Sequence, residues 1–116
     1  FKNLFSAVER LLKEGASLSE ETDDGQTPLH IAAECGLHHM CRLLIKRGVE
    51  IDALDNFGGT ALHAAAACQS GVKVIKVLLK HGADFRIKDA AGMTPCQLAE
   101  KYKHYKISAY LKFYGA

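Results

Sequence analysis

Apolar residues in this chain fall into short clusters with helical spacing, separated by polar and glycine-containing segments. In residues 22–54, Leu29, Ala32 and Ala33 share one face of a first predicted helix. A second helix is predicted over residues 38–47, and we expect its apolar residues to be buried: Met40, Cys41, Leu43, Leu44 and Ile45. An extended hairpin is predicted to follow.

The ends of both predicted helices carry residues that favour such positions. Thr27 is suited to be the N-cap of the first helix, and Pro28 to be its first residue, where a missing N–H costs nothing. Gly36 is expected to end that helix. Gly48 fits the left-handed position after the second helix, where a side chain would strain the backbone.

This layout recurs with a period of 33 to 34 residues, as four glycines show: Gly15, Gly48, Gly82 and Gly115. A Gly-x-Thr triplet keeps the same period, beginning at Gly25, Gly58 and Gly92. A repeat of this length indicates a solenoid, in which each unit buries its apolar face against its neighbours. We expect a single domain with a partial unit and three further units: residues 1–21, 22–54, 55–88 and 89–116.

The residues within the units resemble one repeat family. Thr27–Ala33 reads TPLHIAA, Thr60–Ala66 reads TALHAAA and Thr94–Ala99 reads TPCQLA. The phrase T-P-L-H-x-A is typical of ankyrin repeats, and the chain resembles that family along essentially its whole length. The resemblance implies an all-α solenoid of about 3.5 repeats, in which helix-turn-helix pairs are joined by β-hairpin loops. It also implies that His30 and His63 hydrogen-bond to loop backbone.

The first and last units depart from the pattern. In residues 89–116, Cys96 and Gln97 replace leucine and histidine, and the second helix is rich in lysine and tyrosine, so we expect a C-terminal capping repeat. In residues 1–21, only the second helix of a unit has a counterpart, which predicts a lone helix near residues 2–13. We therefore expect the chain to be a fragment of a longer protein, cut inside a repeat.

Charge and cysteine content narrow the function classes only slightly. The net charge of +2 is too small to indicate nucleic-acid binding by itself. Residues 1–58 carry a net −4 and residues 59–116 a net +6, which predicts an end-to-end dipole. No apolar run reaches the ~18–20 residues of a membrane span. The equivalent residues Cys35 and Cys68 are expected to lie too far apart for a disulfide, and free thiols favour the cytoplasm or the nucleus.

The sequence gives little support for a catalytic site or a metal site. Residues 35–41 read CGLHHMC and contain zinc-ligand types, but they lack the paired spacing of zinc sites. His30 and His63 recur at one repeat position, which favours a structural role over catalysis. The chain has no recognisable nucleophile motif and no phosphate-binding glycine loop. We therefore predict a non-enzymatic protein with no catalytic residue, no metal and no cofactor.

The lysines between Lys101 and Lys112 alternate with tyrosines, as in some nucleic-acid surfaces. Helical spacing gives a simpler account, in which Tyr110, Leu111 and Tyr114 pack inward while the lysines are solvated. We therefore do not predict nucleic-acid binding.

The resemblance implies a concave partner-binding surface, formed by the hairpin tips and the exposed side of each first helix. Matching repeat positions places the following residues on it: Asp23, Asp24, Gln26, Glu34, Cys35, Asn56, Phe57, Gly59, Ala67, Cys68, Ala90, Ala91, Met93, Lys101 and Tyr102.

Phe57 is the most informative of these residues. Its equivalents in the neighbouring units are Asp24 and Ala91, so the scaffold does not require an aromatic residue there. Exposed aromatic residues and methionines are enriched at interface cores, which favours Phe57 and Met93 as apolar anchors.

The sequence thus predicts a protein-interaction module that binds a peptide or a protein domain and is monomeric by itself. A second hypothesis is a regulatory or substrate-recruiting domain of a larger enzyme or channel. A third is contact between the lysine-rich end and an anionic surface, such as nucleic acid or lipid headgroups.

Overall fold

The computed structural model describes residues 25–68 and 71–115. This part of the chain contains six helices and no β-strand. The helices form three successive pairs: α2 (Pro28–Glu34) with α3 (His38–Lys46), α4 (Ala61–Ala66) with α5 (Val72–Lys80), and α6 (Pro95–Lys101) with α7 (Tyr105–Tyr114). The lone helix expected near residues 2–13 lies outside the described residues.

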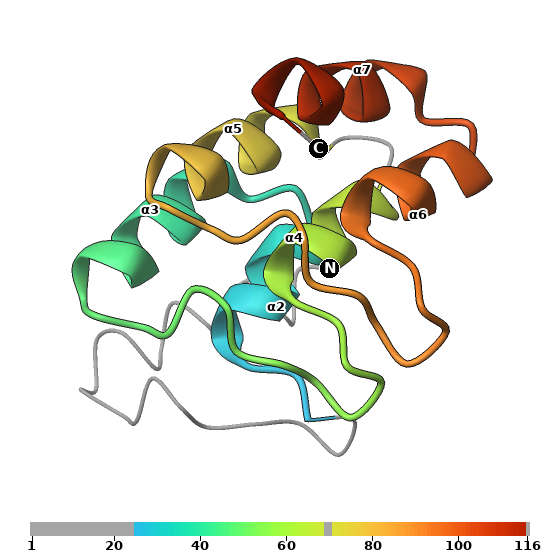
Figure 1. The fold of residues 1–116 in the computed structure, drawn as a ribbon. Coiled ribbons are helices and arrows are strands. Elements are labelled where there is room, and N and C mark those ends of the chain that lie inside the picture. Colours follow the sequence, from blue (N-terminus) through green and yellow to red (C-terminus); the bar gives the residue numbers. More distant parts are fainter. Residues whose placement is uncertain (1–24, 69–70, 116) are drawn as a thin grey trace.

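The helix pairs stack into two layers (Figure 1). One layer consists of α2, α4 and α6, in which α4 packs against both neighbours. The other consists of α3, α5 and α7, with α5 in the middle. We call them the inner and the outer layer. The loops between pairs project beyond the inner layer, as the predicted all-α solenoid requires.

All three inner helices begin with the same capping box. Thr27, Thr60 and Thr94 are the N-caps, and each side chain accepts a hydrogen bond from the backbone N–H three residues later. The side chain of that third residue accepts a bond from the N-cap N–H in return, so two backbone donors are satisfied in each helix. The predicted N-cap role of Thr27 is confirmed.

Small residues of the inner layer and larger residues of both layers form the core, with Leu29 and Leu62 as the large buried residues of α2 and α4. Ala32, Ala65 and Ala99 are fully buried and allow adjacent inner helices to approach closely. The outer helices fill the remaining space with branched side chains, and these are fully or almost fully buried: Leu44, Ile75, Leu78, Ile107 and Leu111. Together these side chains give the stack its continuous apolar core.

Three residues are less buried than predicted: Leu43, Ile45 and Tyr114. Leu43 is 49% exposed, and Ile45 is only partly buried. The buried stripe of α3 runs through Met40, Cys41 and Leu44, and Leu43 lies roughly a quarter turn away from its centre. On α7, Tyr114 is half exposed, although its hydroxyl donates to the Leu79 carbonyl (3.4 Å).

The loops reverse direction through hairpin-like turns without forming a strand ladder in the described residues. In the loop before α4, the Asp55 N–H donates to the Gly59 carbonyl (2.9 Å). Asp89 and Met93 make the equivalent bond before α6 (2.9 Å). Neighbouring loops are also joined to each other, since the Ala90 N–H donates to the Phe57 carbonyl (2.9 Å).

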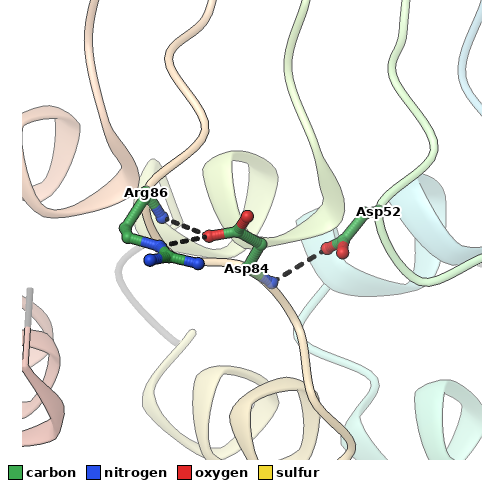
Figure 2. Close-up of polar contacts among 3 residues, drawn as sticks. All are labelled: Asp52, Asp84 and Arg86. Atoms are coloured by element: carbon green, nitrogen blue, oxygen red, sulfur yellow. Dashed lines mark hydrogen bonds and ion pairs between the residues drawn. The ribbon is translucent and has the colours of Figure 1, made fainter.

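A second link between loops lies nearer the outer layer. Figure 2 shows the Asp52 carboxylate accepting a hydrogen bond from the backbone N–H of Asp84 (3.0 Å). The Asp84 carboxylate in turn accepts bonds from the backbone N–H and the Nε of Arg86 (2.9 and 3.3 Å). These bonds from Arg86 lower the pKa of Asp84. Each loop is therefore held both internally and by the loop beside it.

Thiol labelling of the native protein should modify Cys35 or Cys68 first and Cys41 last. All four cysteines are free, but Cys41 and Cys96 are buried, whereas the other two are partly exposed. Burial raises the pKa of the Cys41 thiol to about 12, so it holds almost no reactive thiolate near neutral pH. Time-resolved alkylation followed by mass spectrometry checks this order. Early modification of Cys41, or a disulfide between Cys35 and Cys68, would contradict the stacking described above.

Candidate protein-binding surface

The loops and the inner helices line a hollow of ≈ 220 Å³ that is open to solvent. Asp55, Phe57 and Gly59 line it from the loop before α4, and Asp89 from the next loop. Further walls come from the inner helices and the segment before α2: Gln26, Glu34, His63, Ala64, Ala67 and Leu98. The hollow therefore spans three successive units.

Five of the residues predicted to bind a partner line this hollow: Gln26, Glu34, Phe57, Gly59 and Ala67. Asn56, Ala90 and Ala91 are exposed in the adjacent loop turns, while Met93 is partly buried there. Cys35 and Cys68 are partly exposed where α2 and α4 end. Lys101 and Tyr102 are exposed at the end of α6. Asp23 and Asp24 lie outside the described residues.

Phe57 combines an exposed ring with a fixed backbone. Its side chain is 62% exposed at the rim of the hollow. Its N–H donates to the Asp55 carboxylate (2.9 Å), and its carbonyl accepts from Ala90. The loop thus holds the backbone of Phe57 in position without covering its ring, so a contact made by the ring would not require the loop to become ordered.

Asp55 and Asp89 are lining residues that were not among the predicted surface positions. One oxygen of Asp55 accepts from the N–H groups of Phe57 and Gly59 (2.9 Å each). Asp89 does the same for Ala91 and Met93 (2.9 and 3.0 Å). These carboxylates shape the loop turns and also place negative charge beside the hollow. Their occurrence at equivalent positions, 34 residues apart, was a usable signal in the sequence.

His30 and His63 are buried and connect neighbouring units. In His30, Nδ1 accepts from the Thr27 N–H (3.2 Å), so Nε2 carries the proton and donates to the Gly59 carbonyl (2.9 Å). His63 repeats the arrangement with Thr60 and with the Met93 carbonyl (3.1 and 2.8 Å). The backbone bonds implied by the resemblance are confirmed, and both imidazoles are fully engaged in structure.

The charged side chains that line the hollow are Glu34, Asp55 and Asp89, and each is a carboxylate. Glu34 also accepts a hydrogen bond from the Gln26 side chain (3.3 Å). Positive charge lies at the end of α6, where the Lys101 ammonium sits 5.6 Å from the centre of the Tyr102 ring. Each of the three units therefore contributes a carboxylate to the hollow, and a lysine with an aromatic neighbour lies at the end of the third inner helix.

The residue types of a zinc site do not assemble around the segment 35–41. Cys41 is buried in the core, whereas His39 is exposed near the start of α3. Across residues 25–68 and 71–115, no three His, Cys, Asp or Glu side chains are grouped closely enough to hold a metal ion. Within the same residues, no helix is long and apolar enough to cross a membrane.

Comparison with known proteins finds the same repeat. A family profile described as ankyrin repeats, in three copies, matches residues 1–89. Rabankyrin-5 of Mus musculus and that of Homo sapiens are each 39% identical to this chain over 88 residues, which are 75% of the chain and 7% of the relative. Diacylglycerol kinase iota of Homo sapiens is 34% identical over 102 residues, 86% of the chain and 10% of the relative.

In one shorter relative, the matching segment makes up a larger share of the relative's own length. Cyclin-dependent kinase inhibitor 2A of Homo sapiens is 29% identical over 105 residues, 90% of this chain and 67% of the relative. The chain thus spans only a small part of rabankyrin-5 and of diacylglycerol kinase iota. The repeated capping boxes, the stacked helix pairs and the profile match agree: this chain belongs to the ankyrin-repeat family, whose fold is a non-catalytic protein-interaction module.

Proposed function

We propose that this chain is a non-enzymatic interaction module that binds a peptide or a protein domain across the hollow, with Phe57 and Met93 as apolar anchors. The observation that carries the proposal is the exposed Phe57 ring at the rim of the hollow, on a backbone fixed by two hydrogen bonds. A partly exposed aromatic ring beside small residues such as Gly59 and Ala67 has the character of an interface anchor.

The charges around the hollow favour one orientation of a bound partner. Carboxylates flank the hollow, and Lys101 with Tyr102 lies at the end of α6. A partner with basic and apolar residues over the hollow and an acidic residue near the end of α6 would match this arrangement. Such complementarity sets orientation and association rate more than affinity.

Phe57→Ala should weaken partner binding by ~1–3 kcal/mol, about 5- to 150-fold, because it removes an anchor from the interface. The thermal stability of the Phe57→Ala variant should stay close to that of the native protein, since alanine (Ala91) already occupies the equivalent position in the next loop. Partners captured from a lysate with the native chain are identified by mass spectrometry, and their affinities are then measured with purified components. The Phe57→Ala, Met93→Ala double variant is expected to lose the same partners.

Phe113→Ala is the matched control, because it removes an equally large exposed ring from the outer layer. It should leave affinity for partners of the hollow unchanged. The proposal is wrong if both phenylalanine variants weaken binding equally, or if Phe57→Ala loses binding only because it unfolds.

The second candidate is a regulatory or substrate-recruiting domain within a larger enzyme or channel. The chain corresponds to 7% of rabankyrin-5 and 10% of diacylglycerol kinase iota, so similar segments occur inside much longer proteins. Introducing Phe57→Ala into the full-length parent tests this reading, because the parent's activity or substrate choice should change. The four free thiols favour a reducing compartment, the cytoplasm or the nucleus. We also expect the chain to be monomeric, which light scattering can measure.

A further inference from the structure

Charge in this protein is divided between the two layers. The three outer helices, with the residues that cap their C-termini, contain eight lysines and arginines and not one aspartate or glutamate. The acidic residues of the described chain all lie in inner helices or loops: Glu34, Glu50, Asp52, Asp55, Asp84, Asp89 and Glu100. In the described residues, the charged side chains of the outer helices are therefore all positive.

The middle helix of the outer layer carries three of these cations along its exposed side. On α5, the side chains of Lys73, Lys76 and Lys80 are all exposed and follow one another at helical spacing. Arg42 and Lys46 are exposed on α3, which lies beside α5 in Figure 1. We call the exposed side of α3, α5 and α7 the outer-helix face.

Neighbouring carboxylates neutralise little of this charge. In the described part of the chain, the one ion pair that reaches an outer helix joins Lys112 to Glu100 (3.5 Å). Lys76 lies 5.5 Å from the centre of the Tyr110 ring, a contact that leaves its charge in place. Desolvation, followed by the nearby His39, Lys73 and Arg42, lowers the pKa of His38, as expected where cations of α3 and α5 crowd together. An anionic surface would relieve this repulsion.

Apolar side chains stand among these cations. Phe113 on α7 is 88% exposed, the most exposed of the large hydrophobic residues in the described chain. Tyr105 on α7 and Leu43 on α3 are also exposed. Aromatic rings favour the headgroup region of a bilayer, and lysine side chains reach outward to anionic headgroups from the same depth.

We propose that the outer-helix face docks on the surface of a membrane rich in anionic lipids and leaves the hollow on the opposite side open to a protein partner. Six of the eight cations are lysines, which bind a fluid anionic surface without requiring fixed geometry. A nucleic-acid backbone would give the Phe113 ring nothing apolar to contact, whereas the interfacial region of a bilayer would.

Sedimentation with lipid vesicles tests the proposal. The native chain should bind phosphatidylcholine vesicles that contain phosphatidylserine, and should not bind vesicles of phosphatidylcholine alone. Binding should weaken as salt rises, because the headgroup attraction is screened. Each lysine near an anionic membrane contributes about a fivefold factor to binding, so the triple variant Lys73→Gln, Lys76→Gln, Lys80→Gln should bind roughly 100-fold more weakly.

A second triple variant is the matched control. Lys88→Gln, Lys101→Gln, Lys103→Gln removes the same charge from residues outside the outer helices and should bind vesicles several-fold more tightly than the first triple variant. Phe113→Ser should weaken binding most clearly at high salt, where the apolar contact dominates. Phe57→Ala should leave vesicle binding unchanged, which separates this proposal from that for the hollow. Circular dichroism checks that each variant is folded.

Three results would overturn the proposal. The first is equal loss in both triple variants, which would mean that net charge alone matters. The second is vesicle binding by the folded α5 triple variant at the native level. The third is no binding to phosphatidylserine vesicles together with tight binding to duplex DNA that depends on the α5 lysines, which would assign the face to nucleic acid.

Discussion

Leu62→Ala is expected to lower the free energy of unfolding by ~2–5 kcal/mol, because the change leaves a cavity in a core that cannot collapse around it. Leu62 is 1% exposed in α4, the helix that packs against α2, α5 and α6. Urea unfolding followed by circular dichroism measures the loss. Since α4 touches three other helices, the damage should spread beyond its own unit.

Leu43→Ala is the control for this result. The residue type and the substitution are the same, but Leu43 is 49% exposed on α3. Its loss should cost well under half as much stability, although the sequence alone placed Leu43 in the core. Equal destabilisation by the two variants would show that Leu43 is packed after all and that the described orientation of α3 is incorrect.

His63→Ala should also destabilise the fold strongly, by roughly 2–4 kcal/mol, because it removes a capping interaction and one of the two hydrogen bonds that the Met93 carbonyl accepts. His63 closes the capping box of α4 and donates to the Met93 carbonyl (2.8 Å). Hydrogen exchange gives a local readout. The amide of Asp89, which is bonded to that same carbonyl, should exchange faster in the variant.

Gln97→Ala provides the comparison, since Gln97 occupies the equivalent position in α6. It closes the capping box with Thr94 (3.0 Å) but is exposed and makes no hydrogen bond to another unit within the described chain. Gln97→Ala should therefore cost less than His63→Ala and leave the Asp89 amide protected. If the two variants lose the same stability, the bond between units contributes nothing measurable.

Local chemistry explains which parts of the fold were predictable from the sequence. Thr27, Pro28 and Gly48 have strong positional preferences, so the start of α2 and the end of α3 could be read directly. The spacing of apolar residues was less decisive. Leu43, Leu44 and Ile45 are consecutive, and their burial depends on how α3 is rotated against α2, which hydrophobicity does not determine.

The candidate surface was predictable in outline. Repeat positions brought Gln26 near Gly59 and Glu34 near Ala67, because equivalent residues of a solenoid align in rows. Asp55 and Asp89 were missed because their carboxylates act first on their own loop turns, and only the fold shows that they also border the hollow. The charge of the outer-helix face was likewise hidden, since it emerges only when α3, α5 and α7 lie side by side.

The hydrogen bonds between neighbouring loops should determine how the stack responds to a pulling force. Asp84 N–H to Asp52, Ala90 N–H to Phe57 and His63 to Met93 each join one unit to the next. The first bond lies at the junction of the first two described units, and the other two share the next junction. Tension along the stack would load the two junctions in series, so we expect the weaker junction to separate first. A ligand that contacts two adjacent loops would add a further connection across such a junction and would reduce the relative motion of the two units.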